Sequence, residues 1–120
     1  MKILLLRHFH CNLENTVSNI GLQQFEDVVI QLKRHELSAV IATNHPRVIN
    51  SAKLLCDLLS LNLEVTASKS SDCIENINNR EGILILSQQP ILVEIAGIKA
   101  NETYTNSCFP TGKLVEVKIL

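Results

Sequence analysis

Apolar residues in this chain gather in short runs that alternate with stretches of helical spacing. Three runs, Lys2–Leu6, Ala39–Ala42 and Ile83–Leu86, are typical of strands that are buried on both faces. Two further segments, Leu61–Thr66 and Lys113–Leu120, alternate between apolar and polar residues, which predicts strands with one exposed face. We expect the second of these to lie at or near an edge of the sheet.

Helical periodicity fills most of the chain between these strands. Helices are predicted over Leu22–Arg34, Pro46–Leu59 and Pro90–Ile98, and the last two open with a proline, which suits a first helical turn. Gly21 is expected to break the chain before the first helix, and Ser68–Asn79 to form a loop or a short helix. Together the elements predict an α/β fold, a three-layer sandwich with a mostly parallel sheet, helices on both faces and an antiparallel edge strand.

The composition fits a single folded domain over residues 1–120, because 46% of the chain is hydrophobic. The formal net charge is −1, the charges are mixed, and one Tyr and three Phe offer little for stacking on bases, so we expect no nucleic-acid partner. No apolar run approaches the roughly 20 residues of a membrane span, and the first run is too short for a signal peptide. We therefore expect no membrane association and a cytoplasmic location.

The cysteines give no sign of a disulfide framework or of a metal site. The four of them are scattered without a CxxC pair, which predicts reduced thiols in the cytosol. The spacing His8-x-His10-Cys11 resembles the start of a metal site, but no third or fourth ligand follows at a recognisable distance. We therefore expect neither a metal nor another cofactor.

Polar, chemically active residues follow each of the three buried strands. They are Arg7 and His8 after the first strand, residues 43–47 after the second and residues 87–89 after the third. Because the carboxyl ends of parallel strands share one edge, where α/β proteins bind ligands, these residues are expected to converge. Arg7 has a fork of donors that suits phosphate, and His8 can act as nucleophile, base or acid. The pattern therefore indicates phosphate chemistry.

This argument depends on convergence, because the other residues are weak signals when taken singly. An arginine in the position of Arg47 is more often a solvated helix residue. A histidine in the position of His45 is more often an ordinary loop residue before a helix. Without convergence, the chain is an unrelated α/β protein with solvated side chains at its strand ends.

Four segments resemble the histidine phosphatase (phosphoglycerate mutase-like) superfamily. They are "LLLRHFH", "SNIGLQQ", "VIATNHPRVINSAKLL" and "ILILSQQPIL", which together with a later "TG" run through nearly the whole chain. The short length is similar to that of its small bacterial branch, the phosphohistidine phosphatases. The resemblance implies the same α/β fold and a phosphorylated protein or small phosphorylated molecule as substrate.

The resemblance also implies roles for particular residues. In the family the first strand ends in Arg-His-Gly, where the His becomes phosphorylated and the Arg holds the phosphoryl group. Arg7 and His8 match these positions, whereas Phe9 replaces the glycine, and its ring is expected to cover part of the pocket. Arg47 matches a second phosphate-binding arginine. Gln88 stands where the family has its second, phosphate-binding histidine.

The implied mechanism is a double displacement through phospho-His8, with Arg7 and Arg47 as clamps. The expected phosphate-binding residues are Arg7, Arg47, Ser87, Gln88 and Asn12. Gln88 cannot carry a charge, so activity is expected to be impaired, by analogy about 10²-fold or more. The leaving-group acid is not assigned, with Glu14, Asp72 and Glu75 as candidates. The alternative is a catalytically inactive relative that binds phosphate, a phosphorylated ligand or a partner protein.

Overall fold

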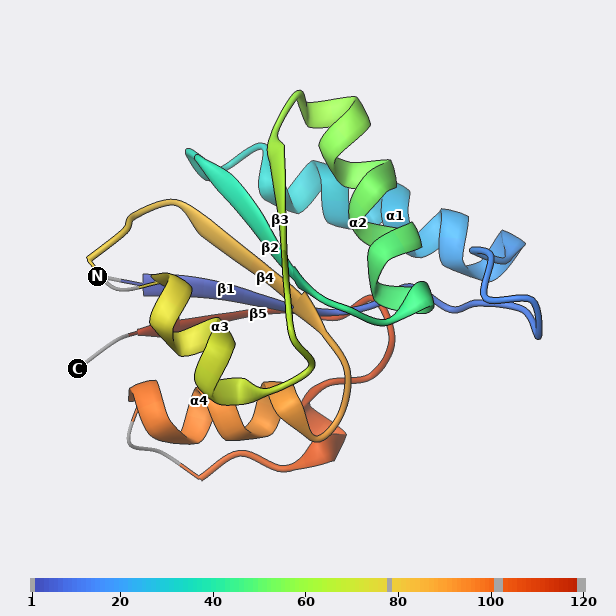
Figure 1. Ribbon diagram of the computed structural model, residues 1–120. Coiled ribbons are helices and arrows are strands. Elements are labelled where there is room, and N and C mark those ends of the chain that lie inside the picture. The colour runs from blue at the N-terminus through green and yellow to red at the C-terminus, as the bar shows by residue number, and fades with distance from the viewer. Residues whose placement is uncertain (1, 78, 101–102, 119–120) are drawn as a thin grey trace.

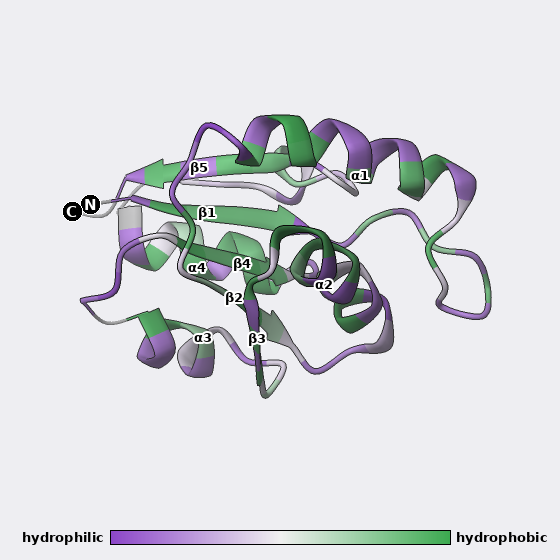
Figure 2. Ribbon diagram, turned by 90° about the horizontal axis from the view of Figure 1, so that it is seen from above, coloured by the Kyte–Doolittle hydropathy of each residue, from purple (hydrophilic) through white to green (hydrophobic). Residues whose placement is uncertain are grey.

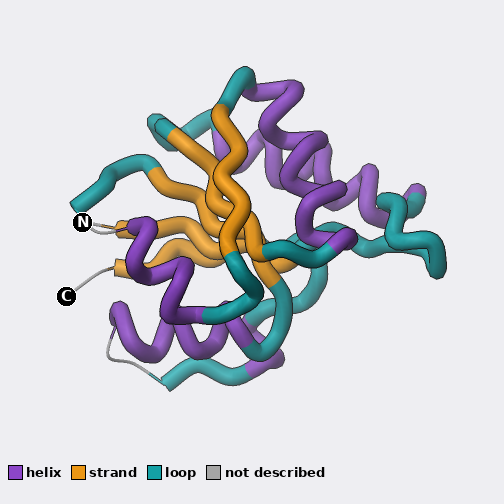
Figure 3. Tube along the Cα trace, in the orientation of Figure 1, coloured by secondary structure: helices purple, strands orange, loops and turns teal. Residues whose placement is uncertain are grey.

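The computed structural model describes residues 2–77, 79–100 and 103–118. These residues form a five-stranded sheet in the order β3-β2-β4-β1-β5 (Figures 1 and 3). The strands are β1 (Lys2–Arg7), β2 (Ala39–Thr43), β3 (Asn62–Thr66), β4 (Ile83–Ser87) and β5 (Leu114–Lys118). The first four pair in parallel, and β5 pairs antiparallel with β1. The predicted fold class, including the antiparallel edge strand, is confirmed.

Helices cover both faces of the sheet, α1 and α2 on one face and α3 and α4 on the other (Figure 1). Their bounds are α1 (Asn19–Leu32), α2 (Pro46–Leu59), α3 (Ser70–Ile77) and α4 (Ile91–Ala100), and a 3₁₀ turn spans Asn106–Cys108. The mainly apolar strands lie between the two helical layers, whereas α1 alternates between apolar and polar residues along its length (Figure 2). The structure is therefore the expected three-layer sandwich.

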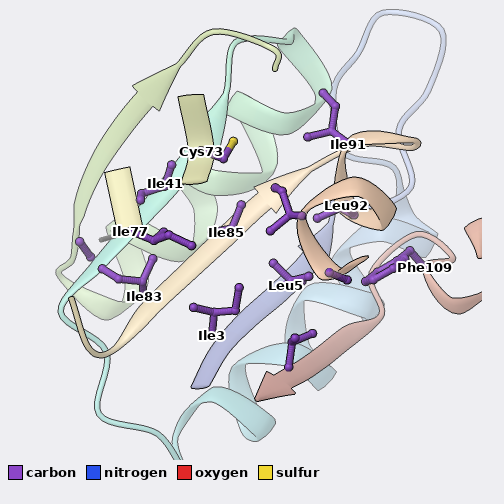
Figure 4. Close-up of a cluster of buried hydrophobic side chains, with 14 residues drawn as sticks. Ile3, Leu5, Ile41, Cys73, Ile77, Ile83, Ile85, Ile91, Leu92 and Phe109 are labelled. Carbon is purple, nitrogen blue, oxygen red and sulfur yellow. The ribbon is translucent and has the colours of Figure 1, made fainter. Parts of the chain in front are cut away.

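The alternation of side chains along each strand explains the uninterrupted apolar runs. In β1, Leu4 and Leu6 pack with residues of α1 and α2, while Ile3 and Leu5 pack with residues of α3 and α4. Figure 4 shows the second cluster, in which Ile3 and Leu5 lie with apolar side chains of α3 and α4. Because successive side chains point to opposite faces, a strand with two cores needs apolar residues at every position.

The predicted break at Gly21 is wrong, because α1 already begins at Asn19. The hydroxyl of Ser18 caps the helix by accepting the N–H of Gly21 at 3.1 Å. Gly21 is buried, and a Cβ atom added there would collide with the carbonyl oxygen of His10 and lie 2.6 Å from Cγ1 of Val17. The glycine therefore permits close packing of α1 against the preceding loop.

Smaller differences concern the ends of elements. Within Ser68–Asn79, the structure has a helix at Ser70–Ile77, and residue 78 lies outside the described residues. The helix predicted from Pro90 begins at Ile91 and runs two residues longer, to Ala100. The last strand ends at Lys118, and residues 119 and 120 of the prediction lie outside the described residues.

Candidate active site

The strand order creates a topological switch point at the carboxyl ends of β1 and β4. These strands are parallel neighbours, and the helices that follow them, α1 and α4, lie on opposite faces of the sheet. In open α/β sheets this arrangement opens a ligand-binding crevice. The ends are tied together, since the N–H of His8 donates to the carbonyl of Ser87 at 3.1 Å. The hydroxyls of Ser87 and Thr43, at the end of β2, lie 2.9 Å apart. The predicted convergence of the three strand ends is therefore confirmed.

His8 is buried and held in one orientation, with an exposed fraction of 4%. Its Nδ1 lies 2.9 Å from the carbonyl oxygen of Phe9. Because a carbonyl oxygen can only accept, Nδ1 must be the donor and must carry the proton. The lone pair of the neutral ring is therefore on Nε2.

The surroundings of His8 favour this neutral form. Burial is the main effect that lowers the pKa of His8, because it removes water from the imidazolium. The hydrogen bond to the Phe9 carbonyl raises the pKa, while the nearby charges of Arg7, Arg47 and His45 lower it further. The net effect is a lowered pKa, so the ring is held as a neutral base or nucleophile near pH 7.

Arg7 ends β1 beside this ring. Its Nη1 makes a long contact of 3.5 Å to the carbonyl of Phe109. Its buried Nε has no hydrogen-bond partner among the described residues. Burial, and after it the charge of Arg47, lowers the pKa of Arg7. Two guanidinium groups therefore act on each other and on one imidazole, which is the charge pattern of an anion site.

Arg47 lies in the first turn of α2 and is held by the loop between β1 and α1. Within this loop Cys11 and Val17 form an isolated antiparallel bridge, and the loop projects from the body of the protein (Figure 1). Nε of Arg47 donates to the side-chain oxygen of Asn15 at 3.0 Å, and the Asn50 amide donates to the Asn15 carbonyl at 2.8 Å. The loop is therefore docked on α2 and orients the second guanidinium group.

Phe9 does not cover the pocket, so that expectation is wrong. Its ring is fully buried in the core with α1 and α2, where it meets Phe25 edge-on at a centroid distance of 5.8 Å. The backbone N–H of Phe9 donates to the hydroxyl of Ser51 at 3.0 Å. The phenyl ring is large and apolar, so it is stabilised by burial in the core. The buried ring therefore lies away from the solvent-facing side of the site.

The other predicted phosphate-binding residues lie in different settings. The side-chain oxygen of Asn12 accepts the N–H groups of Glu14 and Thr16, both at 3.1 Å, which builds the turn of the projecting loop. Ser87 is the fully buried last residue of β4, and its hydroxyl faces Thr43. Gln88 follows it, half-buried, at the strand end.

Two residues that the sequence analysis placed at this edge without assigning them a role contribute to it. Gln89 donates from Nε2 to the carbonyls of Asn106 and Phe109 at 2.6 and 3.2 Å, which fastens the segment before β5 to the site. His45 is the other, since its charge acts on His8. The signal for His45 is its place directly after a buried strand, and only the fold shows that it lies close enough to His8 to act on it.

No carboxylate is among the groups that shift the pKa of His8, so none of Glu14, Asp72 and Glu75 gains support as the leaving-group acid.

Within residues 2–77, 79–100 and 103–118, no cluster of three His, Cys, Asp or Glu side chains could hold a metal ion. None of the described helices has the length and apolar character needed to cross a membrane.

A cavity of about 680 Å³ lies at the opposite edge of the sheet, where its lining includes Lys2, His35 and Gly82. This edge carries the amino ends of the parallel strands. We place the candidate active site at the carboxyl ends instead, because the two arginines and the oriented histidine are there and because ligands of open α/β sheets bind on that side.

Comparison with solved structures decides the fold family. A candidate phosphohistidine phosphatase SixA from Agrobacterium tumefaciens superposes with a TM-score of 0.74 at 11% identity, over 96% of this chain and 89% of that one. The fold is that of the histidine phosphatases. An α-ribazole-5′-phosphate phosphatase candidate from Escherichia coli has a TM-score of 0.69 at 12% identity, over 97% and 89% of the two chains.

A more distant neighbour is a mycobacterial glucosyl-3-phosphoglycerate phosphatase, with a TM-score of 0.68 at 8% identity, over 96% of this chain and 90% of that one. No family model matches the sequence, and no curated protein matches it. At these identities the superpositions establish the histidine phosphatase fold, and the chemistry rests on the residues of the site.

Proposed function

We propose that this protein is a phosphatase-like hydrolase that takes the phosphoryl group of a phosphorylated protein or small phosphorylated molecule onto His8. The observation that carries the proposal is the fixed imidazole of His8, whose Nδ1 is engaged by the Phe9 carbonyl while Arg7 and Arg47 act on the ring. We expect no nucleic-acid partner, no cofactor and a cytoplasmic location, as the composition predicts.

Each group has a defined task in this reaction. The lone pair on Nε2 of His8 attacks phosphorus, the bond to the leaving group breaks, and the leaving group departs with that electron pair. Water then attacks the phospho-His8 phosphorus, the P–N bond breaks, and its electron pair returns to Nε2 as inorganic phosphate leaves. Arg7 and Arg47 bind the equatorial oxygens, where positioning and charge provide most of the catalysis.

The unpartnered Nε of Arg7 supports this assignment. A buried donor without a partner is costly, and an anion bound against Arg7 would satisfy it. The pattern of charges also favours one class of substrate. Among the described residues, two arginines and one histidine act electrostatically on His8 and no carboxylate does, so a leaving group that needs little acid help suits the site. Phosphohistidine is such a substrate, because protonated imidazole leaves readily.

The second candidate function is phosphate or partner binding without turnover, and Gln88 is the observation that favours it. Gln88 follows β4 at the strand end, in the position where the resemblance implies a cationic histidine. An amide can donate a hydrogen bond to a phosphate oxygen but cannot balance its charge. In this function Arg7 and Arg47 still bind the anion, and His8 accepts no phosphoryl group.

The test is to trap phospho-His8 and to measure hydrolysis of an aryl phosphate. We expect an acid-labile phosphoryl group on the wild-type protein, and its loss together with turnover in His8→Ala. His35→Ala is the matched control, because His35 lies at the opposite edge of the sheet. Turnover that is equal in wild type and His8→Ala would refute the enzymatic proposal. Orthophosphate binding by calorimetry, without labelling or turnover, would support the binding function instead.

A further inference from the structure

His45 occupies the N-cap of α2, where its imidazole is an unusual choice. Its Nδ1 accepts the backbone N–H of Arg47 at 3.2 Å, and Pro46 takes the first helical position. Ser, Thr, Asp and Asn are the preferred N-cap residues, since their short side chains reach the same amide groups. The helix therefore does not need a histidine here, which points to a second task for the ring.

The cap bond determines which nitrogen of His45 can donate. Because Nδ1 accepts the Arg47 N–H, the proton of the neutral ring is on Nε2. Nε2 lies on the other side of the ring from the capped amide. The capped histidine therefore keeps one N–H donor that is directed away from the first turn of the helix.

The fold places His45 and Gln88 just beyond the ends of two neighbouring strands. β2 and β4 are parallel neighbours, and the hydroxyls of Thr43 and Ser87 at their ends lie 2.9 Å apart. The N–H of His45 donates to the Thr43 carbonyl at 2.9 Å, and Gln88 directly follows Ser87. His45 is also close enough to His8 for its charge to lower the pKa of that ring. Both residues therefore follow adjacent strand ends at the edge of the sheet that carries His8, and His45 acts on the His8 ring.

We propose that His45 is a phosphate-binding residue, which donates a hydrogen bond from Nε2 of its neutral ring to the phosphoryl group at His8 and so supplies the imidazole donor that Gln88 lacks. The inference rests on the proposed function, since it concerns the same phosphoryl group. In this assignment the second histidine of the site is His45, at the start of α2. The resemblance implies that histidine at the position of Gln88, after β4. The oxygens would then be bound by Arg7, Arg47 and His45 together.

The test is orthophosphate binding, measured by calorimetry on the wild type and on His45→Asn. Asparagine keeps the N-cap and removes the Nε2 donor, so the melting temperature stays close to that of the wild type. We expect about tenfold weaker binding, the value of one hydrogen bond to a charged group. The matched control, His35→Asn at the far edge, binds as the wild type does. Gln88→His in the His45→Asn background restores binding to within a few-fold.

Arg7→Gln in the same titration separates the two proposals. If Arg7→Gln loses binding while His45→Asn binds orthophosphate as the wild type does, the assignment of His45 is overturned and the proposed function stands. If the wild type does not bind orthophosphate, or if Arg7→Gln binds it equally well, the proposed function fails and the assignment of His45 fails with it. If Gln88→His does not restore binding, the two positions are not equivalent, which also overturns the inference.

Discussion

The hydroxyl of Ser51, in the second turn of α2, accepts the backbone N–H of Phe9 at 3.0 Å and donates to the Arg47 carbonyl at 2.8 Å. Phe9 directly follows His8, so one buried hydroxyl joins the segment that carries the nucleophile to the turn that carries the second arginine. The Ser51 hydroxyl thus holds the segment after His8 to the first turn of α2.

Removing this hydroxyl is expected to destabilise the fold. In Ser51→Ala the buried N–H of Phe9 loses its acceptor, which costs about 1–3 kcal/mol. Urea unfolding followed by circular dichroism measures the change. Ser71→Ala, at an exposed position of α3, is the control and should stay within about 0.5 kcal/mol of the wild type. A Ser51→Ala variant as stable as this control would show that the bond contributes nothing.

The lowered pKa of His8 predicts a loss of stability in mild acid. Below the ordinary histidine pKa of about 6.5, the unfolded chain binds a proton at His8 that the folded protein excludes. The free energy of unfolding should therefore fall as the pH is lowered from 7 toward 5. In His8→Asn, whose amide can still donate to the Phe9 carbonyl, this slope should shrink by up to one proton, about 1.4 kcal/mol per pH unit. Equal slopes in the two proteins would contradict the effect.

Phe9→Gly introduces the glycine that the resemblance implies at this position. It should lower the free energy of unfolding, and it should not make the phosphate site more accessible than in the wild type. The ring of Phe9 is fully buried against Phe25, and removing a buried phenylalanine side chain costs about 3–5 kcal/mol. Phe9→Leu, which keeps much of the apolar volume, should cost clearly less in the same urea titration. A Phe9→Gly protein with wild-type stability would mean that the ring is not part of the core.

Gly21→Ala should destabilise α1, although alanine is the better helix former. The added Cβ would collide with the His10 carbonyl and lie 2.6 Å from Cγ1 of Val17, so the loop must move away from the helix. We expect a loss of about 1–3 kcal/mol, as for other overpacked positions. Thermal unfolding measures it, and hydrogen exchange at the amide of Ser18, which donates to the His10 carbonyl, should become faster. A more stable variant would show that helix propensity outweighs the contact.

The local sequence pattern predicts the location of some residues of the candidate site but not of others. Arg7, His8 and Arg47 were found because each follows a buried strand, and the parallel sheet brings such positions together. Phe9 was misplaced, because adjacent residues at a strand end alternate in direction and nothing local tells which one enters the core. The position of Asn12 was equally hidden, since its side chain is engaged by amides within its own loop.

The pattern of apolar and polar residues alone predicts the layered α/β architecture and the edge of the sheet at which the candidate site residues gather. Hydrophobic periodicity is a local property, and it fixes which faces must be buried before any long-range contact is known. Long-range folding is needed to bring His45 close enough to act on His8 and to let Ser51 connect Phe9 to Arg47. These relations join residues about 40 positions apart in the sequence, and their geometry depends on how β1, β4 and β2 pair and on where α2 packs.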